Sequence, residues 1–384
     1  MDYPEFRYYR FAELMSRIIG HSPYDRTRNA RTRRFLIFIF LFVSTVFQIK
    51  NIIIQRSDMD FVIDAMPDTV LLVAIVIIEI IMFTSHDNSA ELMSLIRSDW
   101  KSTYCKEEIK IKKIYTNHWY IYAFVGITYV FFLYLPYTIT NKFIYVIAEH
   151  NETKFDLLFV DERNMDMNSK LFFLVLASIC WLFPFTYVTT LGLLAEMYIF
   201  HSMGMHHVIG YQLENLPNIA NRKNECLEDT YKKIENRLIL CIQRHTKAID
   251  FIILVEAQFY KILAIVEIGI VLMVTFTLMH ALDMDKTVHV KAISFICGQM
   301  FLLSFLCATT QRIIDLHENL SFKAYQCEWF DYPVYLQKII MLIICRSNTP
   351  VVLASTKCVA LTLEKFGSLL KTIVSYYMFF KRIQ

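Results

Sequence analysis

The chain has 384 residues, of which 55% are apolar and 15% are aromatic, and its formal net charge is only +3. This composition, with just 8 glycines and 8 prolines, is typical of a helical protein that crosses a membrane several times, and it argues against a soluble enzyme. No Gly/Ser-rich or Pro-rich linker and no internal repeat divides the sequence, so we expect a single membrane domain over residues 1–384.

Seven apolar stretches follow one another along the chain, and most have the ~17 residues that a helix needs to cross a ~30 Å hydrocarbon core. We therefore expect an all-α membrane protein with seven transmembrane helices. The predicted spans cover about residues 35–54, 69–84, 119–147, 171–200, 251–282, 288–309 and 334–380, and the last is broken near 345–350.

Basic residues alternate between the segments that separate these spans. The segments before the first span, after the second and after the fourth are rich in Arg and Lys, whereas the other connections have almost none. The longest of these other connections is acidic and carries a glycosylation sequon at Asn151. By the positive-inside rule, the N-terminus is expected in the cytoplasm and the C-terminus outside, which is the inverse of a G-protein-coupled receptor.

Two of the basic segments, about residues 85–118 and 210–250, keep a helical spacing of apolar side chains. The neighbouring spans are therefore predicted to continue as helices into the cytoplasm. These extensions form either an assembly platform or ordinary cytoplasmic connections.

The last apolar stretch, Val351–Phe380, is predicted to form a helix with a polar stripe along one side. The stripe consists of Lys357, Glu364, Ser368, Lys371, Ser375 and Arg382. The opposite side carries Val359, Leu363, Phe366, Leu370, Ile373 and Tyr377. Because ionisable groups are costly in a bilayer, the stripe either lines a pore, packs against protein or lies at the membrane surface. One helix cannot enclose a channel, so a pore requires several copies packed around an axis.

Ionisable side chains also occur inside other spans, at Glu79, Glu196, Lys261 and Glu267. Hydration or pairing is expected to explain the two glutamates nearest the cytoplasmic ends, Glu79 and Glu196. The deeper Glu267 is expected to pair with a lysine or to face a cavity.

The sequence gives no sign of a metal site, a cofactor or an enzyme. His206 and His207 are adjacent and point about 100° apart, so they cannot ligate one ion in the usual i, i+4 manner. No nucleotide-binding or hydrolase motif occurs. No nucleic-acid partner is expected either.

The C-terminal region contains a recognisable motif, Tyr325-x-Cys327-x-Trp329-Phe330-Asp331-x-Pro333. It continues through Gln337-Lys338, Arg346-Ser347, Pro350, Phe366-Gly367, Lys371-Thr372 and Ser375-Tyr376. This pattern resembles the C-terminal signature of insect odorant receptors. The Ser98-Asp99-Trp100 triplet after the second predicted span and the inverted topology are also similar to that family.

The resemblance implies an odorant-binding subunit of a ligand-gated, non-selective cation channel, a heterotetramer with the common co-receptor. It places the channel in the plasma membrane of a sensory neuron dendrite. The co-receptor carries a long insertion before the fifth span, whereas here that segment is short. The chain therefore looks like an odour-tuned subunit.

In that family the second half of the broken seventh element lines the pore, which agrees with the polar stripe. Carried over residue by residue, the constriction falls at Phe379 and Ile383. Arg382 stands where the co-receptor has a neutral polar residue. A cation beside the gate would repel permeant cations, so a homotetramer of this chain is disfavoured.

The odorant pocket of the family lies in the outer half of the bundle, among spans two to six. A volatile hydrophobic molecule would bind there mainly through burial of apolar surface. The inward-facing candidates are Ile78, Met82, Thr128, Phe131, Tyr134, Phe183, Tyr187, Phe295 and Gln299. For each of them, ordinary packing between helices is the alternative.

Three other classes of protein share part of this pattern. A G-protein-coupled receptor would need the opposite orientation, and a DRY-like triplet and an NPxxY motif are missing. A gustatory receptor has the same topology, but its TYhhhhhQF-type ending is replaced here by TIVSYYMFFKR. A transporter would be expected to show internal repeats and helices interrupted by Gly or Pro, and these spans mostly lack both.

Overall fold

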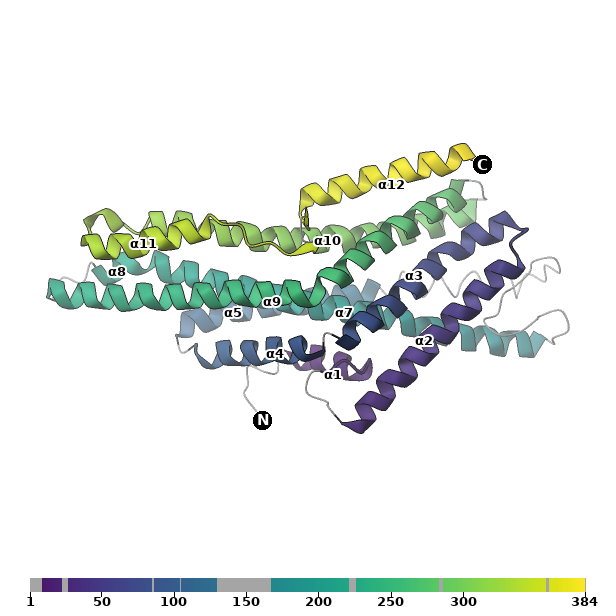
Figure 1. Ribbon diagram of the computed structural model, residues 1–384, viewed down its shortest axis with the longest axis horizontal. Helices are drawn as coiled ribbons and strands as arrows, with labels where there is room; N and C mark the ends of the chain where they lie inside the picture. Colours follow the sequence, from purple (N-terminus) through teal and green to yellow (C-terminus); the bar gives the residue numbers. More distant parts are fainter. Residues whose placement is uncertain are drawn as a thin grey trace.

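The computed structural model describes residues 9–22, 27–84, 86–103, 105–129, 167–220, 226–282, 286–356 and 359–383. These residues form an elongated helical bundle (Figure 1). The helices are α1 (Arg10–Ile18), α2 (Arg28–Ile54), α3 (Met59–Thr84), α4 (His86–Lys101), α5 (Lys106–Tyr129), α7 (Met167–Glu214), α8 (Leu216–Ala220), α9 (Leu227–Leu282), α10 (Lys286–Tyr325), α11 (Val334–Ser347) and α12 (Leu363–Ile383). A 3₁₀ turn, Trp329–Asp331, joins α10 to α11.

Five helical segments of the described chain are long and apolar enough to cross a membrane. They are Arg28–Ile54, Phe61–Phe83, Phe183–Glu214, Leu227–Ala281 and Ala292–Tyr325. All five overlap spans expected from the sequence. Residues 130–147 of the third expected span lie outside the described residues, and the number of crossings stays a prediction.

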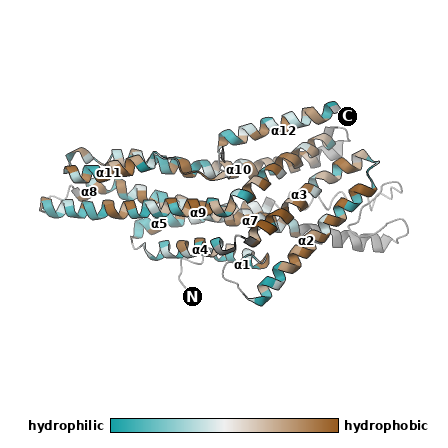
Figure 2. Ribbon diagram, in the orientation of Figure 1, coloured by the Kyte–Doolittle hydropathy of each residue, from teal (hydrophilic) through white to brown (hydrophobic). Residues whose placement is uncertain are grey.

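The helical periodicity of the basic segments is confirmed, because several helices continue well beyond a membrane length. α7 has 48 residues, α9 has 56 and α10 has 40. At 1.5 Å per residue, α9 is about 84 Å long, far more than a ~30 Å hydrocarbon core. Figure 2 shows apolar residues along α2, α3 and the second half of α9, whereas the first turns of α9 are hydrophilic.

The predicted helix over Val351–Phe380 is wrong before Leu363. The chain there forms a small antiparallel hairpin of β1 (Ala354–Thr356) and β2 (Val359–Ala360), and α12 begins only at Leu363. The amide of Leu361 donates to the carbonyl of Leu353 across the hairpin at 3.1 Å. β-Branched residues and Pro350 favour extended backbone here, and they outweigh the apolar periodicity. Val359 therefore lies on a strand, and Lys357 lies outside the described residues.

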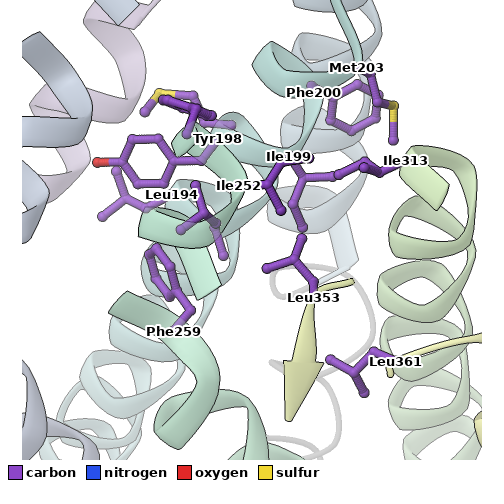
Figure 3. Close-up of a cluster of buried hydrophobic side chains, with 14 of the residues drawn as sticks. Leu194, Tyr198, Ile199, Phe200, Met203, Ile252, Phe259, Ile313, Leu353 and Leu361 are labelled. Atoms are coloured by element: carbon purple, nitrogen blue, oxygen red, sulfur yellow. The ribbon is translucent and has the colours of Figure 1, made fainter. Parts of the chain in front are cut away.

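The hairpin is inserted into the core of the bundle. Its Leu353 and Leu361 are 3% and 1% exposed, and they meet buried side chains of α7, α9 and α10 (Figure 3). The labelled members of this core are Leu194, Tyr198, Ile199, Phe200, Met203, Ile252, Phe259, Ile313, Leu353 and Leu361. α12 thus starts from a segment that is anchored between three long helices.

Candidate functional site

The polar stripe of α12 is exposed on this chain. Glu364, Ser368, Lys371, Ser375 and Arg382 are exposed, and Phe379 is 59% exposed. The side chain of Ile383 lies outside the described residues. Among the described residues, the stripe is therefore not packed against its own chain, which leaves a pore, a partner subunit or the membrane surface to cover it.

α12 packs against the bundle through few buried apolar side chains. Leu369 and Ile373 are 6% and 3% exposed, whereas Leu363 and Leu370 of the predicted apolar side are largely exposed. The ring of Phe380 lies 6.0 Å from that of Phe276 on α9. The helix is thus held along one edge and leaves most of its surface free for other contacts.

An ion pair also joins α12 to α9. Lys365 Nζ lies 2.8 Å from Glu267 Oε1, and these side chains are 22% and 12% exposed. The expectation that Glu267 pairs with a lysine is confirmed, although the sequence did not identify Lys365 as the partner. Because the pair sits at the start of α12, it couples the position of this helix to α9.

Three of the predicted ligand-binding residues lie together near the C-terminal end of α3. Ile78, Met82 and Tyr187 are 1%, 3% and 0% exposed. Met82 accepts a hydrogen bond from Gln258 at 3.6 Å, and the Tyr187 hydroxyl donates a short hydrogen bond to Glu79. The polar group of Tyr187 is therefore already engaged within the protein.

Glu79 is the centre of a buried polar cluster. His21 Nε2 donates to its Oε2 at 2.6 Å, and Arg34 Nε donates to its Oε1 at 3.2 Å. Burial lowers the pKa of His21 below its ordinary value, although the neighbouring carboxylate acts in the opposite direction. The prediction that pairing explains Glu79 is confirmed. The three partners come from three other parts of the chain, and the cluster joins the N-terminal residues to α2, α3 and α7.

Glu196, the other glutamate of this kind, is also buried. Thr309 Oγ1 on α10 donates to its Oε1 at 3.2 Å, so the partner found among the described residues is a hydroxyl. The contact connects α7 with α10.

Of the remaining predicted ligand-binding residues, Phe183 lies one helical turn before Tyr187 on α7, and the other described ones lie on α5 and α10. Phe295 and Gln299 are buried in the first turns of α10, and the ring of Phe183 meets Phe40 of α2 at 5.8 Å. Thr128 is half-buried and donates to a carbonyl of its own helix. Phe131 and Tyr134 lie outside the described residues.

Met82 and Phe295 lie on helices that begin at the same end of the bundle. α3 begins at the end of the bundle where α9 passes into α10, and it runs away from that end (Figure 1). Met82 lies 23 residues after the start of α3, about 35 Å along the helix, whereas Phe295 lies only about 14 Å into α10. Met82 and Phe295 are therefore separated along the bundle.

A cavity of about 180 Å³ lies between α4, α5, α7 and α9, away from the predicted ligand residues. Its wall includes Asp99, Lys112, Met205, Arg244 and Phe251. Lys112 Nζ lies 2.5 Å from Asp99 Oδ2. Burial acts to raise the pKa of Asp99, but the neighbouring His201 and Lys112 outweigh it and hold that pKa well below its ordinary value.

The Ser98-Asp99-Trp100 triplet belongs to the same region. Trp100 Nε1 donates to the hydroxyl of Tyr9 at 3.3 Å, and this hydroxyl lies 3.1 Å from His201 Nδ1. His201 Nε2 in turn lies 3.3 Å from Asp99. The triplet therefore fastens α4 to α5, α7 and the N-terminal residues.

A bundle with several helices long and apolar enough to cross a bilayer defines a multi-pass membrane protein. The family model described as 7tm Odorant receptor matches residues 58–374, so the chain belongs to the odorant receptor family.

The fold is similar to that of the insect olfactory receptor OR5 from Machilis hrabei in complex with eugenol, with a TM-score of 0.82, 11% identity and 100% of both chains covered. A second structure of OR5 from Machilis hrabei gives a TM-score of 0.78 at 12% identity, again over 100% of both chains. None of the curated proteins matches the sequence. At these identities, the likeness shows the fold alone.

Proposed function

We propose that the chain is the odorant-binding subunit of a ligand-gated, non-selective cation channel in the plasma membrane of a sensory dendrite. The observation that carries this proposal is the exposed polar face of α12, since a helix of membrane length with such a face needs a polar environment. One α12 cannot enclose a pore. The channel therefore combines this chain with copies of the co-receptor in a heterotetramer, with the N-terminus in the cytoplasm.

The ligand is a volatile hydrophobic molecule. Membership of the odorant receptor family and the binding of eugenol by the structurally similar OR5 support this assignment. We assign the pocket to Thr128, Phe131, Tyr134, Phe183, Phe295 and Gln299. We leave Ile78, Met82 and Tyr187 out of this assignment, because the hydroxyl of Tyr187 is bound to Glu79 and Met82 accepts a hydrogen bond from Gln258.

Gating requires that the ligand bind the open form more tightly than the closed form. When the ligand binds, α9 and α10 move. Because the ion pair between Glu267 and Lys365 and the hairpin before α12 connect α12 to these helices, α12 moves with them. The displacement of α12 widens the constriction at Phe379 and Ile383. Arg382 beside this constriction repels cations, so neutral residues of the co-receptor complete the conducting pore.

The deciding experiment is a whole-cell recording with a panel of volatile odorants, with this chain expressed alone and then with the co-receptor. Current only in the presence of the co-receptor is expected. Phe295→Ala should then raise the half-maximal odorant concentration about ten-fold, because a buried aromatic contact is lost. Phe301→Ala is the matched control, since Phe301 is 44% exposed on the same helix.

Other outcomes point to other functions. Current from this chain alone would contradict the role given to Arg382. Currents evoked by tastants but by no volatile odorant would favour a gustatory-type channel. Accumulation of ligand inside the cell without current would favour a transporter.

A further inference from the structure

Three buried histidines from three long helices meet near the end of α11. His206 of α7, His245 of α9 and His317 of α10 are 1%, 3% and 0% exposed. The ring of His317 lies 5.5 Å from that of His206 and 5.1 Å from that of His245. The histidine cluster, as we name these three residues, lies outside the odorant pocket and the pore helix described above.

Two backbone carbonyls fix the tautomers of this cluster. His206 Nδ1 lies 2.9 Å from the carbonyl oxygen of Ser202, and His317 Nε2 lies 3.1 Å from that of Thr349. A carbonyl oxygen only accepts hydrogen bonds, so both of these ring nitrogens carry the proton. In neutral imidazoles the other two nitrogens, His206 Nε2 and His317 Nδ1, are then unprotonated, and they face each other at 3.4 Å.

Two lone pairs that face each other in a buried site repel, and this repulsion is relieved by a proton on one of the rings or by a metal ion between them. The separation also matches metal coordination, since Zn–N bonds of about 2.0–2.1 Å place two ligand nitrogens about 3.3–3.4 Å apart around a tetrahedral ion. A ring N–H that donates to a backbone carbonyl is the usual outer-shell support of a metal-bound histidine.

His245 offers a third nitrogen. Its Nε2 is buried and has no hydrogen-bond partner among the described residues. The described side chains do not already form a complete group of three ligands around one point, so a rotation of this ring is needed. Arg346 is the charged residue facing the cluster from α11, and its exposure to solvent weakens its repulsion of a cation.

We propose that His206 Nε2 and His317 Nδ1 bind a divalent transition metal ion such as Zn²⁺, with His245 as the third ligand. The ion would connect α7, α9 and α10 beside the carbonyl of Thr349, which precedes the hairpin and α12. Metal binding would therefore restrict the relative motion of α7, α9 and α10, which hold the hairpin that precedes α12.

Cobalt provides a direct test, because tetrahedral Co²⁺ absorbs visible light. The full chain is purified in detergent, stripped with a chelator and titrated with Co²⁺. We expect about one equivalent to bind, with the visible bands of tetrahedral nitrogen coordination, and Zn²⁺ to displace it. His206→Gln and His317→Gln should each weaken binding at least ten-fold, and His245→Gln should weaken it less.

His118→Gln is the matched control, since His118 is exposed on α5, and it should bind Co²⁺ like the wild type. Size-exclusion profiles verify that each variant is folded, and His245→Gln serves if either of the other two variants aggregates. A folded wild-type protein that takes up no Co²⁺ would overturn the proposal, as would uptake that none of the three substitutions changes. The visible absorption of bound Co²⁺ is measured without any ionic current, so the result tests the metal site independently of the proposed channel function.

Discussion

Two carboxylates in the interior of this protein pair with side chains from other parts of the chain. Glu79 meets Arg34 and His21, and Asp99 meets Lys112 and His201. Removing one member of such a group leaves the others buried without compensation, which costs more than the pair contributes when intact. At the residue scale, these clusters are where single substitutions should have the largest effects on stability.

Glu79→Gln should lower the free energy of unfolding by about 3–5 kcal/mol. The amide keeps the shape of the side chain and can still accept from Tyr187, but it leaves the charge of Arg34 unpaired. Thermal unfolding of the detergent-solubilised protein measures the effect. Glu91→Gln, on the exposed face of α4, should change stability by no more than about 0.5 kcal/mol. Equal melting temperatures for the two variants would contradict this view of the cluster.

His21 should make stability depend on pH. Its pKa is lowered in the folded protein, so as the pH falls below about 6.5 the unfolded chain takes up a proton that the folded chain resists. Stability is therefore lost as the pH falls, by up to about 1.4 kcal/mol per pH unit for this one proton. The slope is obtained from denaturant unfolding at several pH values.

His21→Gln keeps a donor for Glu79 and removes the titrating group, so its pH slope should be smaller than that of the wild type. His118→Gln, at an exposed position, is the control for replacing a histidine as such. If His21→Gln and the wild type lose stability in parallel, His21 is not the residue that takes up the proton.

At the scale of elements, α12 differs from the other long helices because it is attached along one edge. Its apolar contacts, Leu369 and Ile373, are supplemented by the ion pair of Lys365 with Glu267. The hairpin before it is held in the core. A helix attached in this way can change its angle without unpacking the bundle.

The ion pair should show energetic coupling. Lys365→Met and Glu267→Gln are each expected to destabilise the protein, and the double variant should lose about 1–2 kcal/mol less than the sum of the two. Unfolding in denaturant gives the three values. A double variant whose loss equals that sum would show that the contact contributes no interaction energy.

The exposed face of α12 should react with water-soluble thiol reagents when the channel opens. In the proposed channel, Ser375→Cys is expected to allow a charged methanethiosulfonate reagent to reduce odorant-evoked current by at least half. Ile373→Cys, at a position that is 3% exposed, is the control and should be unaffected. Block at both positions, or at neither, would argue against pore lining by this face.

At the scale of the whole molecule, exposed apolar side chains occur in two settings. On α2, Phe35 and Leu36 are 62% and 60% exposed, as expected for a helix that faces lipid. On α11, Val334 and Leu342 are 65% and 64% exposed, yet this helix lies at the end of the bundle where α9 is hydrophilic (Figures 1 and 2). Apolar surface away from lipid is typical of a subunit interface.

If the proposed heterotetramer forms through this face, Leu342→Glu should weaken its assembly with the co-receptor at least ten-fold, as seen by co-purification from detergent. It should leave the fold unchanged, because the side chain is exposed. Leu227→Glu, at a position 69% exposed at the start of α9, is the control for an added surface charge. Undiminished co-purification of Leu342→Glu would exclude this face of α11 as an interface.

The sequence by itself determined the helical class, the approximate positions of the long helices and the odorant receptor family, because apolar runs, charge alternation and the C-terminal motif are local patterns. It did not predict the hairpin before α12, where β-branched residues outweighed the apolar periodicity. The resemblance to the family also assigned Met82 and Phe295 to one pocket, whereas the two residues lie at different distances along their helices.

Only the tertiary structure decided which side chains meet. Glu79 and Tyr187 are separated by 108 residues, and His206 and His317 by 111. Helical periodicity shows which face of a helix is buried, but the partner on the other side depends on how whole helices pack, and that packing is set by many contacts between distant segments.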